Sequence, residues 1–371
     1  MKLVCEREKL LGAFQIAATV APTRSPKPIL QSVRLEVVGD AVMLLATDLE
    51  VGIRIQVDGV QVEGEGAVVL PVLQFGNILR ESVDEKLVIE VGETGIVVEG
   101  DHSRFNLAYQ DPDDFPGVAG FEDESFIQLP ARLLKELIRR TLFATDNESS
   151  RYALGGVLIE LDGNSLVAVG TDGRRLAKMG GPIEIVGTLS AGDSPIIIPA
   201  RSMQLIDRAV VDLDENVQLA PHENEVLVRA GTTEIYSRLV EGRFPKWKEA
   251  LPKRSDVPTV DITVGPMYSA IRQAAIVASD ESRGIDFVFG NGSLVLKGLT
   301  AEIGDSRVEF PVPYDGDEIT VSMNHRYVED FLKVLDAETT FTLEIQNSES
   351  PALFTTADGF VYVVMPLAAN R

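Results

Sequence analysis

The sequence is poor in cysteine, histidine and uninterrupted apolar segments, and each shortage excludes a class of protein. Cys5 is the single cysteine, so no intrachain disulfide can form and a reducing compartment is expected. The three histidines lie in unrelated contexts, without an HExxH motif or a cysteine pair, so we expect no metal site and no cofactor. Charged residues interrupt the apolar residues at the N-terminus, and no run reaches the roughly 18 apolar residues of a membrane span. We therefore expect a cytoplasmic protein with no membrane partner.

The usual signatures of catalysis are also missing from the sequence. It contains neither a GxxxxGK[ST] phosphate loop nor a GxSxG elbow. Asp172, in the segment Thr171–Gly173, follows an apolar run and could be a catalytic carboxylate at the end of a strand. An Asp-Gly pair is more typical of a hairpin turn, and we favour that interpretation. The sequence thus predicts a protein that is not an enzyme.

Positive charge is scarce overall, because 57 acidic residues outnumber 34 lysines and arginines and give a net charge of −23. Such a chain repels polyanions at long range unless its basic residues gather on one face. Many of them fall in or beside predicted helices, namely Arg80, Arg132, Lys135, Arg139, Arg140, Arg201, Arg208, Arg272, Arg283, Arg326 and Lys333. These helices could line a surface that holds phosphates weakly. The alternative is a set of ordinary solvated helix faces with ion pairs such as Glu136 to Arg140.

The 371 residues exceed the length of one ordinary domain and contain a threefold repeat. Three segments, from Leu3, Ile127 and Ile262, each predict a short strand, an amphipathic helix and a hairpin. Strand-helix segments recur midway through each repeat, from Val68, Ile196 and Ile319. We place the domains at residues 1–122, 123–254 and 255–371, with an α+β architecture in which helices cover one face of each sheet.

The C-terminal segment FVYVVMPLAANR is apolar almost to its end. A loose terminus gains little from burial and is normally polar. Val363, Val364, Met365 and Leu367 are therefore expected to pack against another part of the protein.

Motifs spread over the whole chain resemble the family of the bacterial DNA polymerase III β subunit, the replicative sliding clamps. They are KPIL from Lys27, TDLE from Thr47, SRFNL from Ser103, DFP from Asp114, SSRYALGGVLIEL from Ser149, VGTDGRRLAK from Val169, LVEGRFPKW from Leu239 and YVVMPL from Tyr362. The resemblance implies three repeated domains of the DNA-clamp (processivity-fold) type, with helices lining the inside and sheets forming the outside of a ring. It implies a homodimer that encircles double-stranded DNA without reading its sequence and tethers the polymerase during replication.

The resemblance also implies a hydrophobic pocket that accepts short linear motifs. Its partners would be the DNA polymerase III α subunit, the clamp loader, other polymerases and repair proteins. By motif match, the pocket comprises Arg151, Leu154, Thr171, Gly173, Arg174, Arg175, Leu176, Pro245, Asn324, Tyr327, Val363, Val364, Met365, Pro366 and Leu367. Glu249 replaces a basic residue of many relatives, and the tail ends in AANR instead of a basic-apolar pair, so peptide preference is expected to differ.

Two further surfaces follow from the same resemblance. The residues expected to face DNA are Arg24, Arg80, Tyr152, Arg201 and Arg208, with Ala153 standing where some relatives have a second aromatic residue. The residues expected at the head-to-tail dimer interface are Arg104 and Phe105 on one side and Ile276, Val277, Glu302 and Asp305 on the other.

Two other functions compete with a sliding clamp. A three-repeat scaffold that binds peptides but not DNA would lack basic helix faces directed into a ring. An enzyme would need a clustered pair of acids with perturbed pKa values in a cleft, and the sequence displays none.

Overall fold

The computed structural model describes residues 1–92, 95–146, 153–189, 195–252, 257–279, 281 and 283–367. The chain forms two compact units. Unit 1 comprises residues 1–135 and 183–240, and unit 2 comprises residues 136–182 and 241–371. The predicted domain boundaries at residues 122 and 254 stay a prediction.

Unit 1 contains two antiparallel sheets and three helices besides α3 (Ala131–Thr141), which begins in it. The smaller sheet has the order β5 (Val60–Glu63), β1 (Lys2–Glu6), β7 (Lys86–Val91), β8 (Gly95–Glu99), β9 (Arg104–Ala108). The larger has the order β14 (Glu184–Val186), β10 (Phe126–Pro130), β16 (Asn216–Pro221), β17 (Glu225–Ala230), β18 (Thr233–Arg238), β4 (Val51–Gln56), β3 (Ala41–Thr47), β2 (Ser32–Val38), β6 (Gly66–Pro71). The remaining elements are β15 (Ile196–Pro199), α1 (Arg7–Ala18), α2 (Val72–Glu81), α4 (Ala200–Ala209) and 3-10 turns at Pro28–Gln31 and Pro112–Asp114.

Unit 2 is also built from antiparallel strands and helices. One run of paired strands has the order β11 (Gly156–Asp162), β12 (Ser165–Thr171), β13 (Arg175–Pro182), β26 (Val361–Val364), β25 (Ala352–Thr356), β24 (Thr340–Glu344), β19 (Thr259–Thr263). The second sheet has the order β22 (Gly304–Pro311), β21 (Ser293–Thr300), β20 (Gly284–Gly290), β23 (Ile319–Asn324). The helices are α5 (Trp247–Ala250), α6 (Val264–Ala274), α7 (His325–Lys333) and the 3-10 turns Leu142–Ala144 and Ala275–Val277.

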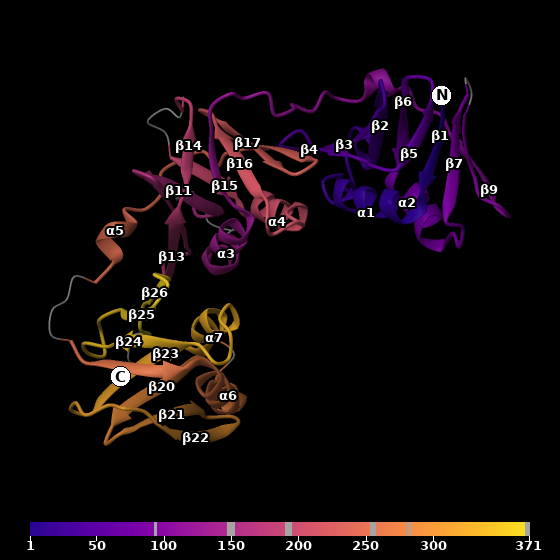
Figure 1. Cartoon of the computed structure of the whole chain (residues 1–371). Coiled ribbons are helices and arrows are strands. Elements are labelled where there is room, and N and C mark those ends of the chain that lie inside the picture. The colour runs from indigo at the N-terminus through magenta and orange to yellow at the C-terminus, as the bar shows by residue number, and fades with distance from the viewer. Residues whose placement is uncertain are drawn as a thin grey trace. The chain divides into compact units, whose positions relative to one another are not determined.

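The predicted repeat is confirmed at the level of secondary structure. Strands β1, β10 and β19 each lead directly into a helix, which is α1, α3 or α6, and strands β6, β15 and β23 lead into α2, α4 and α7. Within unit 1, α1 and α2 lie side by side, as α6 and α7 do in unit 2 (Figure 1). Phe14 of α1 packs edge-on against Phe75 of α2, with ring centroids 5.0 Å apart. The pairing of helices follows from apolar stripes that must be buried against each other and against a sheet.

The core of unit 2 is an aromatic cluster around Phe331 of α7. Its ring lies 5.1–5.4 Å from four other aromatic rings, those of Phe341, Phe354, Phe360 and Tyr362. All five side chains are fully buried. Two of these rings belong to β26 or the residue before it, so the C-terminal strand is part of this core.

Candidate functional site: the C-terminal strand and its neighbours

The segment from Thr171 to Arg175 is a tight turn between β12 and β13. Gly173 has φ +83°, a conformation that favours glycine. Asp172 Oδ1 accepts hydrogen bonds from the backbone N–H groups of Arg174 (2.8 Å) and Arg175 (2.9 Å), and Thr171 Oγ1 donates to Arg175 O (2.6 Å). Asp172 therefore acts as a structural acceptor, and the prediction of a turn here is confirmed.

The last strand, β26, pairs with β13, which lies far from it in the sequence (Figure 1). Leu176 is opposite Val363 and Arg175 is opposite Val364. Past the strand, Met365 N donates to Arg174 O (2.9 Å) and Leu367 N donates to Ser322 O (2.8 Å). The expectation that the apolar tail packs against another part of the chain is thus confirmed through Leu367, while the AANR residues 368–371 lie outside the described residues.

Burial divides the tail into core and surface. Val363 and Val364 are buried, whereas Met365 leaves 44% of its surface exposed, and Pro366 and Leu367 are half-buried. Leu154, Thr171 and Leu176 are also buried, and Pro245 is half-buried. The exposed apolar surface of the tail is therefore centred on Met365.

All the described members of the predicted peptide pocket lie in unit 2. Arg174 O bonds to the tail, and Ala153 N, next to Leu154, donates to Arg243 O (3.2 Å) two residues before Pro245. Asn324 caps α7, since its side-chain oxygen accepts from Arg326 N (3.0 Å). Arg151 lies outside the described residues.

Tyr327 is linked to the tail strand through its backbone. The hydroxyl of Tyr362 donates to Tyr327 O (2.9 Å), and complete burial raises the pKa of that hydroxyl well above its usual range. The Tyr362 phenol is therefore neutral and holds the first turn of α7 against β26.

Arg175 is the most extensively bonded of the predicted pocket residues. Its side chain is only 11% exposed and pairs with Asp172 (3.0 Å) and Asp330 of α7 (2.7 Å). Burial alone lowers the pKa of Arg175, but the two aspartates raise it, and the net pKa lies above the usual value of an arginine. Asp330 was not anticipated from the sequence, where it is one more acid in an acidic chain.

Glu249, which stands in place of the basic residue implied by the family resemblance, lies on α5. Glu249 pairs with Lys246 (3.3 Å), and both side chains are exposed. The buried Trp247 between them donates from Nε1 to Glu160 (3.1 Å), which also pairs with Lys248 (2.9 Å). The negative charge of Glu249 is thus partly neutralised by Lys246, the residue directly before its helix.

The basic residues of α3 form ion pairs within the chain. Arg132 pairs with Asp214 (2.5 Å) and Lys135 with Asp207 (3.3 Å). The predicted pair of Glu136 and Arg140 is present at 2.9 Å. The ion pairs of the alternative interpretation are therefore present on α3, but Arg140 is buried and does not belong to a solvated face.

The residues expected to face DNA differ in their surroundings. Arg201 pairs with Asp48 and donates to Val20 O (3.1 Å), and Arg80 donates to Asn77 (3.0 Å). Arg24 and Arg208 are exposed. Tyr152 lies outside the described residues.

The residues expected at the dimer interface lie at or beside sheet edges. Arg104 and Phe105 belong to β9, the last strand of its sheet in unit 1, where Phe105 is 38% exposed. In unit 2, Ile276 is 75% exposed, and Glu302 and Asp305 are exposed at or just before β22, also a last strand. Val277 is half-buried beside them in the sequence.

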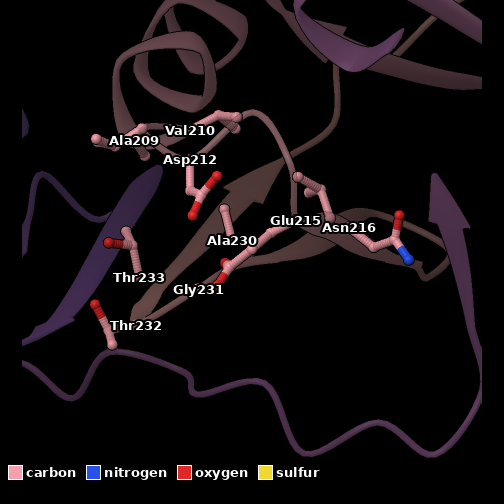
Figure 2. A pocket seen from close by; sticks show the side chains of 11 residues that line it. Ala209, Val210, Asp212, Glu215, Asn216, Ala230, Gly231, Thr232 and Thr233 are labelled. Atoms are coloured by element: carbon pink, nitrogen blue, oxygen red, sulfur yellow. The ribbon is translucent and has the colours of Figure 1, made fainter. Parts of the chain in front are cut away.

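A hollow of about 230 Å³ in unit 1 contains none of the predicted site residues. Figure 2 shows its lining side chains from the end of α4, the start of β16 and the turn between β17 and β18, with Asp212 and Glu215 among them. Among the residues that the structure describes, no group of three or more His, Cys, Asp or Glu side chains could hold a metal ion. Within the same described ranges, no helix is long and apolar enough to span a bilayer.

Comparisons with known proteins find the same protein family along almost all of the chain. Residues 1–119, 128–246 and 248–368 match models of the N-terminal, central and C-terminal domains of the DNA polymerase III beta subunit. The chain is 31% identical to a beta sliding clamp of Pseudomonas putida and 29% identical to one of Chlamydia muridarum. The alignments cover 99% of this chain and 100% and 99% of those proteins.

Solved structures agree with the sequence comparisons. The crystal structure of the DNA polymerase III subunit beta from Pseudomonas aeruginosa has a TM-score of 0.90 at 29% identity, covering 99% of this chain and 100% of that one. A sliding clamp of the same organism bound to griselimycin has a TM-score of 0.91 at 29% identity and covers 99% of each chain.

Proposed function

Because the chain belongs to the DNA polymerase III beta subunit family, whose members are sliding clamps, we propose that two copies close head to tail into a ring around duplex DNA. The family match over three successive regions carries this proposal. It confirms the predicted three-domain clamp fold and the prediction of a non-catalytic processivity subunit in DNA replication. The domain boundaries at residues 122 and 254 form part of the proposal.

Two sheet edges support the head-to-tail contact. Strand β9 of unit 1 and strand β22 of unit 2 each end a sheet, so their outer backbone groups can pair with another strand. Phe105 on β9, together with Ile276 and Ile303 near β22, exposes apolar surface beside those edges. A contact between two different surfaces closes into a ring when the rotation is right, and two contacts then hold the dimer. Arg104, Val277, Glu302 and Asp305 complete the proposed interface.

We propose that DNA is held by enclosure and weak contacts rather than by tight binding. The net charge of −23 opposes DNA binding at long range, and Arg201 and Arg80 already have partners within the chain. Arg24 and Arg208 are exposed and are the proposed phosphate contacts, with Tyr152 beside them in the family pattern. Few phosphate contacts give weak, salt-dependent attraction, which suits a ring that must slide.

Partner proteins are proposed to bind the tail of unit 2 through short linear motifs. Leucine or phenylalanine anchors of the DNA polymerase III α subunit, the clamp loader, other polymerases or repair proteins would bury apolar area against Met365, Leu367 and Pro245. Each square ångström buried contributes about 25 cal/mol. Methionine is flexible, so one pocket can accept several sequences. Because duplex DNA is its proposed partner, the protein is proposed to act in the cytoplasm.

The test is retention on DNA after loading. The purified protein is loaded onto nicked circular DNA by a cognate clamp loader with ATP and separated by gel filtration before and after linearisation. Retention on circles and loss from linear ends would support enclosure. Equal loss from both, with peptide binding intact, would favour the three-repeat peptide scaffold instead.

A further inference from the structure

We propose that Arg175 is a positioning residue: it holds the ring of Tyr327 and helix α7 in the arrangement that a partner peptide binds, without touching the peptide. This inference rests on the proposed peptide-binding function and differs from the role of pocket wall that the family resemblance implies. A residue that does not contact the peptide would then determine which peptides the pocket accepts.

The geometry leaves no nitrogen of the Arg175 guanidinium without a partner. Nε donates to Asp172 Oδ2 (3.0 Å), Nη1 to Asp330 Oδ2 (2.7 Å) and Nη2 to the backbone oxygen of Phe143 (2.7 Å). A planar fork with three fixed acceptors is highly oriented, and lysine cannot reproduce it. Arg175 therefore joins the β12–β13 turn to α7 and has little capacity left for a ligand.

Two aromatic rings enclose the same guanidinium. Its central carbon lies 4.5 Å from the ring centroid of Tyr327 and 5.5 Å from that of Phe143. Cation–π attraction of this kind orients a ring as well as stabilising it. Tyr327, which is half-buried and predicted to contact the peptide, is thus held by Arg175 on its ring and by Tyr362 at its backbone oxygen.

Unit 1 contains the same turn without the arginine. Thr47 Oγ1 donates to Val51 O (2.8 Å), and Asp48 Oδ1 accepts from the backbone N–H groups of Glu50 (3.0 Å) and Val51 (2.8 Å), as Asp172 does in unit 2. Leu49 has φ +81°, close to the value of Gly173. Val51 therefore occupies the position of Arg175.

The tail hydrogen bonds are repeated as well. Arg238 N donates to Glu50 O (3.0 Å), as Met365 N does to Arg174 O, and Val240 N donates to Ile197 O (2.8 Å), as Leu367 N does to Ser322 O. The backbone of this motif therefore forms without an arginine in the position of Arg175.

In unit 1, Val51 lines a hollow of about 140 Å³ together with Thr19, Val20 and Leu205 and with the polar side chains of Arg201, Gln204 and Arg208. Asp48 pairs with Arg201 of α4, so the second carboxylate oxygen of the turn is again bound to a guanidinium, but one that comes from the helix. The arginine on the strand is thus specific to unit 2, where its additional partners are the ring of Tyr327 and the carboxylate of Asp330.

The test compares Arg175→Met, Arg175→Lys and Asp330→Asn with Lys178→Met, a change of another basic side chain on β13. The full-length protein is titrated against a fluorescein-labelled peptide from the C-terminal tail of a cognate polymerase, and polarisation gives Kd. We expect Arg175→Met to raise Kd about tenfold, because the charge-assisted bonds within the chain that fix the site are lost, and Arg175→Lys to restore less than half of this loss on a logarithmic scale. Asp330→Asn should also raise Kd, whereas Lys178→Met should leave it unchanged.

A double-mutant cycle separates positioning from direct contact. In a Tyr327→Ala background, Arg175→Met should change Kd less than about twofold, because the ring that it positions is gone. An equal loss in both backgrounds would mean that Arg175 binds the peptide itself and would overturn the inference. If Arg175→Met does not fold, as judged by its melting temperature, an unchanged Kd for Asp330→Asn would overturn it as well. Failure of the wild-type protein to bind the peptide would instead refute the proposed function.

Discussion

The Met365→Ala substitution is the most direct test of where a partner peptide gains its binding energy. Met365 is bonded into the structure by its backbone, which donates to Arg174 O (2.9 Å), so the side chain can be shortened without moving the tail. Full burial of a methionine side chain contributes about 1.5–3 kcal/mol, and 44% of this residue remains exposed, so a peptide could gain about 0.7–1.3 kcal/mol by covering it. Peptide affinity should therefore fall about three- to ninefold.

Fluorescence polarisation with a labelled polymerase tail peptide measures this loss, and thermal unfolding of the same samples reports stability. Val83→Ala is a suitable control, since Val83 is 90% exposed and lies in unit 1, outside the proposed pocket. The reasoning would be refuted by a Met365→Ala protein that binds the peptide as well as the wild type does. An equal loss in the Val83→Ala control would also refute it.

Four further outcomes are expected. Phe105→Ala should remove about 1 kcal/mol at each of two interfaces and weaken the dimer about 30-fold, and an unchanged mass by analytical ultracentrifugation at low concentration would contradict this. Gly170→Ala should lower the free energy of unfolding in urea by about 1–3 kcal/mol, because its Cβ would overlap the carbonyl oxygen of Thr141. Gly12→Ala, inside α1 with open space around it, should raise that free energy by up to about 1 kcal/mol, so a similar loss in both variants would refute the steric explanation. Deletion of residues 365–371 should abolish peptide binding with the dimer intact, and retained affinity would exclude the tail from the site.

The hairpins could be predicted from the sequence because their signals are local. Alternating apolar residues mark the strands, and glycines at the turns adopt positive φ, as at Gly39 (+60°), Gly163 (+59°) and Gly292 (+73°). The pairing of β26 with β13 could not be predicted from such signals. Alternation identifies the buried face of a strand but not its partner, which here lies far away in the chain.

The electrostatic environment of the helices was only partly predictable for the same reason. The pair of Glu136 and Arg140 lies within one helical turn and follows from spacing alone. Arg132 and Lys135 are paired with acids 82 and 72 residues away along the chain, at positions that only the fold brings together. Counting basic residues on a predicted helix therefore overestimates the positive charge that is free to meet DNA.

The repeat itself explains why sequence similarity between its copies does not reveal which copy binds a partner. Gly52 lies opposite Tyr236 in unit 1, in the place that Leu176 holds opposite Val363 in unit 2. A Cβ at Gly52 would lie 2.7 Å from a methyl carbon of Val118. In unit 1 the side chain of Val118 therefore fills the space beside that strand.

The side chains at the end of the turn and at the start of the tail also differ between the units. In unit 1, Glu50 and Arg238 form an ion pair (3.5 Å), where unit 2 has Arg174 and the exposed Met365. The backbone hydrogen bonds of the turn and the tail are the same in both units. The units therefore differ in a few side chains, and these determine whether apolar surface stays exposed for a peptide. Such differences involve only one or two residues at each position. Their effect on the site can be interpreted only once the pairing of the strands is known.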